Sequence, residues 1–136
     1  MNTAELEKLR DLMPFAVLLG IEVVRATPEV VQARVRWRPE LCTAGGLMHG
    51  GVLMALADTC GGASAYLNLP AAAEGTATIE SKTNFLRGVR EGSVTATTRP
   101  LHRGRTLIVL ETELSLEDDR LAAKVTQTQA YLYPRG

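Results

Sequence analysis

The chain has 136 residues, 46% of them hydrophobic, and its 15 basic residues balance its 15 acidic residues. This length and hydrophobic fraction are typical of one folded unit with its own core, so we predict a single domain over residues 1–136. The charge balance argues against a general nucleic-acid-binding protein, which carries a basic excess or stripe.

The N-terminal residues, MNTAELEKLRDLMP, place Leu6, Leu9 and Leu12 at helical spacing, and Pro14 ends the pattern. We predict a short amphipathic helix over residues 3–12. This segment lacks the apolar core of a signal peptide. The one long apolar run, residues 50–73, is interrupted by a carboxylate, two glycine pairs and a proline, which argues against a membrane span. We therefore expect a cytoplasmic protein without a membrane partner.

Most of the remaining chain has the pattern of β-strands. The segment VQARVRWRP alternates apolar residues with polar ones, and the preceding LLGIEVVRA predicts its hairpin partner. Four further strands are predicted over 76–87, 93–102, 106–116 and 121–133, separated by the turn signals REGS, HRGR and LEDDR. Strands of this length joined by short turns favour an antiparallel meander.

The exception is the segment 49–67, where apolar side chains recur at helical intervals: Val52, Leu53, Leu56, Ala57, Cys60, Ala63 and Leu67. Because most of its other residues are also small or apolar, we predict a long helix that is buried on most sides. The fold class is therefore α+β, a curved antiparallel sheet of about six strands wrapped around one central helix. Dimerisation through an edge strand would protect that edge.

Asp58 is the only formally charged residue between Gly50 and Ala73. Burying an unpaired carboxylate costs several kcal/mol, so Asp58 needs either hydrogen-bond partners or a function. One interpretation is a buried anchor that accepts hydrogen bonds from local backbone amides or a threonine. The other is a base or a nucleophile, because an apolar environment makes a carboxylate a stronger base.

Gly50 and Gly51 lie where the predicted helix begins. The first turn of a helix has free N–H groups, and glycine lets a substrate carbonyl approach them, as an oxyanion hole requires. Gly51 and Asp58 are seven residues apart, about 10 Å along a helix axis, whereas both would have to lie about 3 Å from one reacting centre. If both act on one substrate, Asp58 must come from a second chain, which predicts a two-fold dimer.

Two other residue types could carry chemistry. We favour His49 as a hydrogen-bond partner beside the carbonyl site, with a helix-entry role as the alternative, and interpret His102 as a solvated turn residue. With two histidines and no cysteine at ligand spacing, we expect no metal site. Cys42 and Cys60 are expected to be small buried or half-buried residues and to form no disulfide framework.

These residues together resemble the hotdog-fold acyl-CoA thioesterases, and within them the PaaI-like branch of phenylacetate-pathway thioesterases. The resemblance rests on His49-Gly50-Gly51, an acidic residue nine positions after the histidine, and the later segments TNFLR and HRGRT, in that order. It covers most of the chain. It implies a helix wrapped by an antiparallel sheet, assembled into homodimers or dimers of dimers.

The resemblance also implies an activity, the hydrolysis of an acyl-CoA thioester, possibly an aryl one, to a free acid and coenzyme A. By position, the Gly50 N–H would polarise the thioester carbonyl, and Asp58 of the other subunit would activate water or attack directly. His49 would support the site, and a hydroxyl at Thr78 would help to hold water. No cofactor is implied beyond the coenzyme A of the substrate.

The chain departs from the family at Thr43, where relatives often carry Asn or Gln six residues before the histidine. A threonine hydroxyl cannot replace the two-sided bonding of a carboxamide, so water or thioester would be oriented differently here. Arg87, Arg103 and Arg105 are candidate contacts for the coenzyme A phosphates. The alternatives are a non-catalytic acyl-CoA-binding or regulatory module and, less favoured, a hotdog dehydratase or hydratase.

Overall fold

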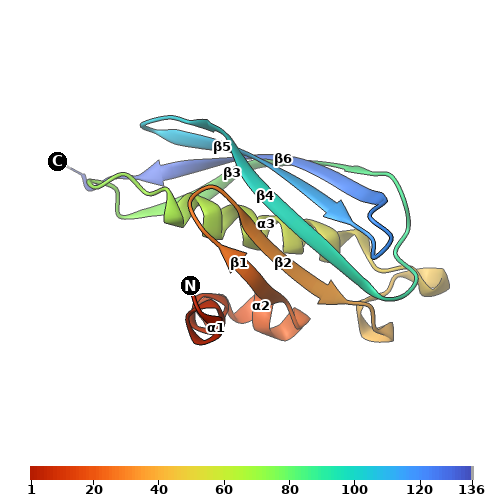
Figure 1. The fold of residues 1–136 in the computed structure, drawn as a ribbon. Helices are drawn as coiled ribbons and strands as arrows, with labels where there is room; N and C mark the ends of the chain where they lie inside the picture. The colour runs from red at the N-terminus through yellow and green to blue at the C-terminus, as the bar shows by residue number, and fades with distance from the viewer. Residues whose placement is uncertain (136) are drawn as a thin grey trace.

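A computed structural model describes residues 1–135, and Gly136, the last residue of the predicted domain, lies outside the described residues. Within residues 1–135, six strands form one antiparallel sheet around a long helix (Figure 1). The strands are β1 (Glu22–Ala26), β2 (Val31–Arg36), β3 (Gly75–Phe85), β4 (Ser93–Arg103), β5 (Leu107–Ser115) and β6 (Leu121–Leu132). The helices are α1 (Thr3–Asp11), α2 (Pro14–Leu19) and α3 (Gly50–Leu67), with two short 3-10 turns over Pro39–Leu41 and Ala44–Gly46. The predicted fold class is confirmed.

The strand order is β1-β2-β4-β5-β6-β3. The predicted meander is correct for β4, β5 and β6, but β3 pairs with β6 and not with β4. The reason is that α3 separates β2 from β3 in the sequence. The chain crosses the sheet along this helix, so β3 starts at the opposite edge of the sheet from β1. As a result, β3 is an edge strand, and its Thr78 lies opposite Gln129 of β6.

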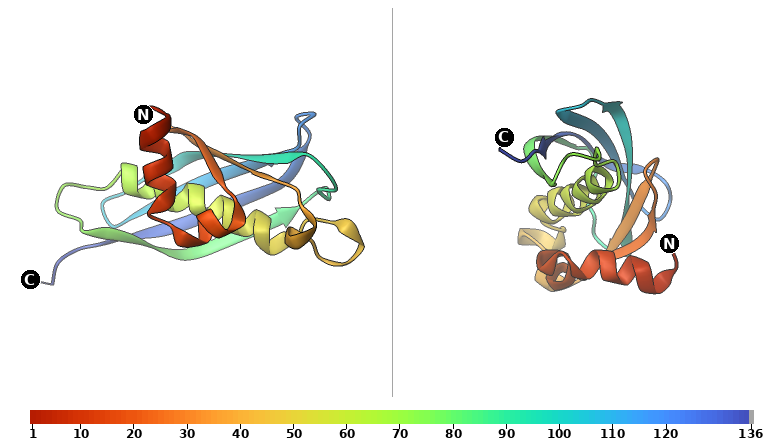
Figure 2. Two further views of the ribbon diagram at one scale, coloured as in Figure 1. Left: turned by 90° about the horizontal axis from the view of Figure 1, so that it is seen from below. Right: turned by 90° about the vertical axis from the view of Figure 1, so that its left-hand side faces the viewer.

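The sheet curves around α3, as the end-on view in Figure 2 shows. Leu56, Ala57 and Cys60 are buried against the strands. One face of α3 is not covered, however, and it exposes Gly51, Met54, Asp58 and Tyr66 at helical spacing. The helix is thus buried on most sides, as predicted, and we call the exposed side the open face of α3.

The N-terminal segment differs from the prediction because it contains two helices. Asn2 caps α1 by accepting a hydrogen bond from the Glu5 N–H at 2.9 Å. Pro14 does not only end this helix but also occupies the first turn of α2, a position that proline favours. Gly20, with a φ of +72°, ends α2 in the left-handed conformation. Leu18 and Leu19 of the predicted strand LLGIEVVRA are therefore outside β1, which begins at Glu22.

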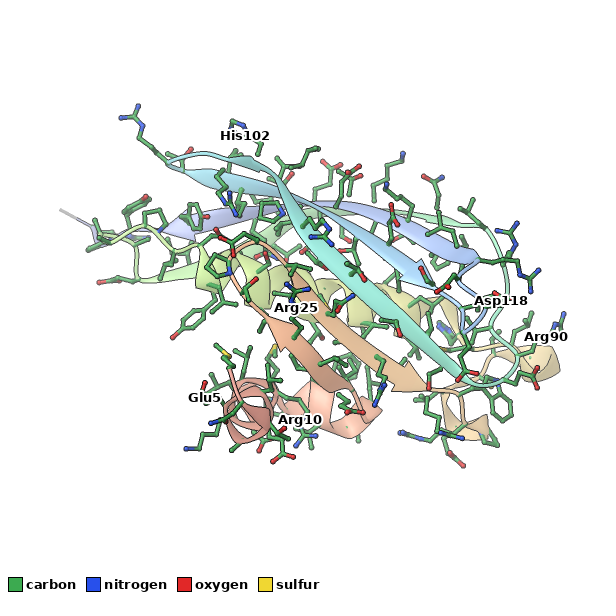
Figure 3. The ribbon with its side chains drawn as sticks, in the orientation of Figure 1. Glu5, Arg10, Arg25, Arg90, His102 and Asp118 are labelled. Atoms are coloured by element: carbon green, nitrogen blue, oxygen red, sulfur yellow. The ribbon has the colours of Figure 1, made fainter. Side chains whose placement is uncertain are left out.

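Charged side chains lie mainly on the surface, and Figure 3 shows Arg25, Arg90, His102 and Asp118 there. His102 was predicted in a turn; it is exposed as expected but belongs to β4, near the hairpin to β5. In the part of the chain that the structure describes, no helix combines the length and the apolar character needed to cross a membrane.

Candidate functional site

The start of α3 is capped by its own histidine. Nδ1 of His49 accepts a hydrogen bond from the Gly51 N–H at 2.8 Å. A Cβ on Gly51 would lie 2.8 Å from the same nitrogen, so this cap requires glycine at position 51. Because Nδ1 is an acceptor, the neutral ring carries its proton on Nε2. The structure thus gives His49 the helix-entry role, uses the Gly51 N–H internally, and leaves support of a substrate by Nε2 as a prediction.

The Gly50 N–H, in contrast, is free. No acceptor for it lies among residues 1–135. It adjoins a pocket of about 330 Å³, a size suited to part of a small-molecule ligand. The pocket is lined by Thr43, Leu47, Met48, Gly50, Leu53, Phe85, Leu86, Arg87, Gly88 and Val89. The structure therefore brings three predicted site residues together here, namely Thr43, Gly50 and Arg87.

Asp58 lies on the open face of α3 and is exposed in the protomer. The other residues of its own chain therefore do not bury its carboxylate, contrary to the expectation of an apolar environment. Its Oδ1 accepts two hydrogen bonds, from the Thr78 hydroxyl at 2.7 Å and from Gln127 Nε2 at 2.9 Å. In the described chain, no hydrogen bond or ion pair reaches Oδ2. Asp58 and Thr78 are thus brought together, as expected, and one carboxylate oxygen is available to a ligand.

Two buried glutamines stand behind this carboxylate. Gln127 and Gln129 are 2% and 1% exposed. Gln129 Nε2 donates to the Thr78 hydroxyl oxygen at 2.6 Å and to Gln127 Oε1 at 3.2 Å. Sequence reasoning missed both residues. The available signal was the alternation in VTQTQAY, which places the two glutamines on the inward face of β6 beside Val125.

A second pocket of about 330 Å³ lies at Asp58, and its lining includes Thr78 and Gln129. Beside it lies an apolar pocket of about 290 Å³, lined by Leu9, Leu12, Met13, Gly62, Ala63, Tyr66 and Thr76. The two pockets share Met13, Gly62 and Thr76. A carboxylate therefore lines one of two neighbouring pockets, and the other pocket is apolar.

Gly50 and Asp58 are not brought together in one protomer. They are eight residues apart in one regular helix, which separates them by about 12 Å along its axis. A nucleophile or base and an oxyanion donor must both approach one carbonyl within about 3 Å. If Gly50 and Asp58 act on one carbonyl, each chain therefore carries two candidate half-sites, one at each of these residues.

The β4–β5 hairpin, which carries Arg103 and Arg105, lies toward the C-terminal end of α3 (Figure 1). Arg103 donates from Nε to Asn68 Oδ1 at 2.9 Å and from Nη2 to the Pro28 carbonyl at 3.0 Å, so its guanidinium links a helix end to a turn. The Arg105 carbonyl accepts a hydrogen bond from the Tyr133 hydroxyl. Their contact with coenzyme A stays a prediction.

The cysteines belong to neither half-site. Cys60 is buried, and loss of solvation raises the pKa of its thiol to about 12, so it stays protonated and unreactive at neutral pH. Cys42 is half-buried, and both thiols are free. Within residues 1–135, no three side chains of the His, Cys, Asp and Glu types cluster as metal ligands.

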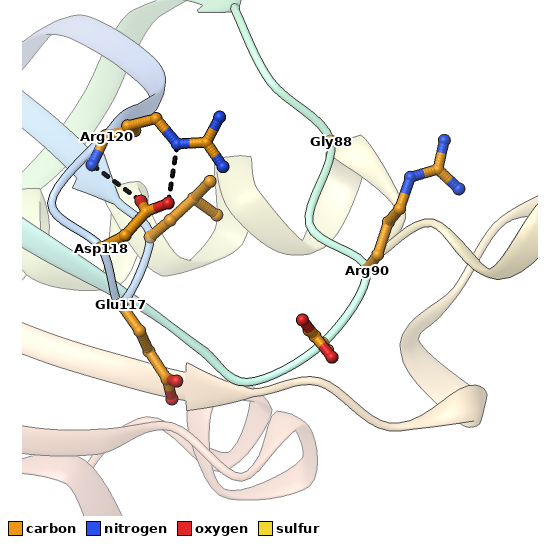
Figure 4. A pocket seen from close by; sticks show the side chains of 7 residues that line it. Gly88, Arg90, Glu117, Asp118 and Arg120 are labelled. Atoms are coloured by element: carbon orange, nitrogen blue, oxygen red, sulfur yellow. Dashed lines mark hydrogen bonds and ion pairs between the residues drawn. The ribbon is translucent and has the colours of Figure 1, made fainter.

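A further surface pocket lies between the loop before β4 and the turn between β5 and β6 (Figure 4). Its carboxylate Asp118 accepts hydrogen bonds from the Arg120 backbone N–H at 3.1 Å and from Arg120 Nε at 2.7 Å. These bonds, the backbone one first, lower the pKa of Asp118. Because Glu91 and Glu117 also line this pocket, its charge is mixed and does not favour an anionic ligand.

Comparisons with known proteins agree on one family. A family model described as the thioesterase superfamily matches residues 45–123. A crystal structure of a mutant of thioesterase PA1618 from Pseudomonas aeruginosa has a TM-score of 0.89 at 30% identity and covers 95% of this chain and 94% of that chain. The structure of thioesterase HI1161 from Haemophilus influenzae has a TM-score of 0.87 at 28% identity, covering 94% and 90%.

The sequence of PA1618 is 32% identical over 131 residues, which are 95% of this chain and 90% of that protein. Rv1847, a candidate esterase of Mycobacterium tuberculosis, is 30% identical over 118 residues, covering 85% and 84%. Similarity of this extent, in both sequence and structure, spans the two half-sites and the sheet that surrounds them.

Proposed function

This chain belongs to the thioesterase superfamily and has its hotdog fold, and on that premise we propose that it hydrolyses acyl-CoA thioesters at a site shared by two protomers. The observation that carries the proposal is the separation of the half-sites. A free N–H at Gly50 and a free carboxylate oxygen at Asp58 each adjoin a pocket, but about 12 Å of helix lies between them.

In the proposed reaction, the Gly50 N–H donates to the thioester carbonyl oxygen and stabilises the negative charge that develops there. Asp58 of the second protomer takes a proton from water as the water oxygen attacks the carbonyl carbon, or attacks that carbon itself and forms an anhydride that water then cleaves. The C–S bond breaks, and the thiolate of coenzyme A leaves and is protonated. The Nε2–H of His49, an exposed residue, would be a second donor to the carbonyl.

The open face of α3 supports the shared site. It exposes Met54 and Tyr66 to 38% and 56%, although the opposite side of the helix, with Leu56, Ala57 and Cys60, is buried in the core. A second copy whose α3 runs antiparallel would cover this face and bring Gly50 toward the partner's Asp58. The unpaired edge of β3, which exposes Ile79 to 62%, lies beside this face and would be covered with it.

The apolar pocket beyond Asp58 supports an aryl or medium-length acyl group. Leu12, Met13 and Tyr66 give it apolar walls, and its volume in the protomer is about 290 Å³. An aryl group would also agree with the proposed place of this chain in the PaaI-like branch. A panel of aryl, short-chain and long-chain acyl-CoA substrates, followed by release of free thiol, measures this preference.

The first experiment tests the role of the Gly50 backbone N–H. Gly50→Pro removes the backbone N–H, whereas Gly50→Ala keeps it. Proline fits here because position 50 is the first of the helix and His49, at φ −59° and ψ 133°, has the extended conformation that residues before proline adopt. A Cβ would lie 3.1 Å from the ring of Phe85, which is 52% exposed and can move. We expect Gly50→Pro to lower kcat by roughly 100-fold or more, the effect of losing one oxyanion donor, and Gly50→Ala to retain most activity.

The second experiment asks whether the site is shared. Asp58→Asn and Gly50→Pro should each be inactive as homodimers. Unfolded and refolded together, they form heterodimers in which one site combines the intact Gly50 of one chain with the intact Asp58 of the other. Activity should return in the mixture, whereas a site within one chain would leave the mixture inactive.

Three results would contradict the proposal. The first is a wild-type protein that cleaves no acyl-CoA. The second is an Asp58→Asn variant that cleaves acyl-CoA as fast as wild type. The third is a refolded mixture of the two variants that shows no gain in activity. Tight binding of acyl-CoA without turnover would instead indicate a binding module, and hydration of an enoyl-CoA would indicate a hydratase.

A further inference from the structure

The hydrogen-bond network behind Asp58 has a fixed direction. The amide nitrogen of Gln129 can only donate, and it reaches the Thr78 hydroxyl oxygen at 2.6 Å and Gln127 Oε1 at 3.2 Å. Because the Thr78 oxygen accepts this bond, its single hydrogen points to Asp58 Oδ1 at 2.7 Å. One donor therefore determines where the hydroxyl hydrogen of Thr78 lies.

The same donor orients the neighbouring amide. Gln127 Oε1 accepts from Gln129, which turns the Gln127 nitrogen toward Asp58 Oδ1 at 2.9 Å. The reversed amide would place a carbonyl oxygen against a carboxylate oxygen, which is repulsive. Two donors thus occupy Oδ1, and Oδ2 has no partner in the described chain.

We propose that Gln129 is a positioning residue that directs both hydrogen bonds to Asp58 Oδ1 and thereby makes Oδ2 the reacting oxygen. The inference rests on the proposed function, because it assigns an atom of the same site. Gln129 is 1% exposed, so water does not compete for its N–H groups. Gly61 of α3 leaves the space for this arrangement, since a Cβ there would overlap Oε1 of Gln127.

Gln129→Met tests the inference because methionine has a similar shape but cannot donate. We expect kcat for the preferred thioester to fall roughly 10- to 100-fold, the effect of a catalytic group displaced by about 1 Å, while KM stays unchanged. The matched control is Gln32→Met. Gln32 Nε2 donates to the Thr97 hydroxyl at 3.0 Å between β2 and β4, so the same kind of bond is lost away from Asp58. This control should not change kcat.

A second readout separates positioning from stability. In a chain that already carries Thr78→Val and Gln127→Met, the groups that Gln129 orients are gone. Adding Gln129→Met to that chain should then leave kcat unchanged. A further fall of the same size as in wild type would overturn the inference, as would full activity of the single variant Gln129→Met.

A third readout uses the wild-type protein and so does not depend on whether a variant folds. NMR measures how fast side-chain amide hydrogens exchange with water. The side-chain amide hydrogens of Gln127 and Gln129 should exchange with water far more slowly than those of Gln32, and equal rates for all three would overturn the inference. The outcomes also separate the two proposals. A wild-type protein without thioesterase activity rejects the proposed function, whereas an active wild type with an equally active Gln129→Met rejects only the role of Gln129.

Discussion

At the scale of single residues, the three candidate arginines are in different situations. The Arg103 guanidinium donates to Asn68 and to the Pro28 carbonyl, whereas Arg87 lines the same pocket as Gly50. One nitrogen of Arg87 donates to the Leu121 carbonyl at 3.0 Å, which holds the side chain but leaves other N–H groups for a phosphate. The contact of Arg87 with the coenzyme A phosphates stays a prediction.

Arg87→Met should raise KM for acyl-CoA roughly 10- to 100-fold, since a hydrogen bond to a charged group contributes about 1.5–3 kcal/mol. It should not change KM for the same acyl group on N-acetylcysteamine, which has no phosphates. Arg99→Met, at an exposed position of β4, is the control. An equal change in KM for both thioesters would show that Arg87 supports the fold and not the nucleotide.

At the scale of elements, the contact between α3 and β6 depends on one of two adjacent glycines. A Cβ on Gly61 would overlap the amide oxygen of Gln127, which is buried and bonded to Asp58, so it cannot move freely. A Cβ on Gly62 would meet nothing within 4 Å. The sequence shows only the pair Gly61-Gly62, and the structure separates their roles.

Gly61→Ala should lower the free energy of unfolding by about 1–3 kcal/mol, the cost of overpacking a core. Gly62→Ala should leave that free energy unchanged or raise it by up to about 1 kcal/mol, because alanine favours the helix. Urea denaturation of both variants measures the difference. If Gly61→Ala proves as stable as Gly62→Ala, the helix and β6 do not approach as closely as described.

At the scale of the whole molecule, the positions of the half-sites place the two-fold axis of the proposed dimer. If Gly50 of one protomer faces the partner's Asp58, the axis crosses α3 midway between them, at Met54. Met54 lies on the open face and is 38% exposed. A residue on a two-fold axis contacts its own copy.

Met54→Cys, in a Cys42→Ser background, should therefore form a disulfide-linked dimer on mild oxidation, because a disulfide needs Cα atoms about 4.4–6.8 Å apart. Cys60 is buried and does not interfere. Leu101→Cys, 61% exposed near the β4–β5 hairpin, is the control and should not cross-link. A dimer in solution whose Met54→Cys never cross-links would rule out this antiparallel arrangement of α3.

The sequence alone determined the features that depend on local spacing. Alternation located β2, turn signals separated the strands from β3 to β6, and helical periodicity located α3. The distance from Gly51 to Asp58 along one helix also predicted that, if both act on one substrate, they belong to two chains. At the N-terminus, local signals were less reliable, because Pro14 both ends one helix and starts the next.

Only the tertiary structure decided what depends on contacts between distant segments. The pairing of β3 with β6 brings Thr78 to Gln129, 51 residues later, and the curved sheet brings Gln127 to Asp58, 69 residues away. The tertiary structure also showed that the His49 ring accepts a hydrogen bond from the Gly51 N–H and that Asp58 is exposed in its own protomer. Periodicity tells which face a side chain occupies, but the groups it meets there depend on how the elements pack.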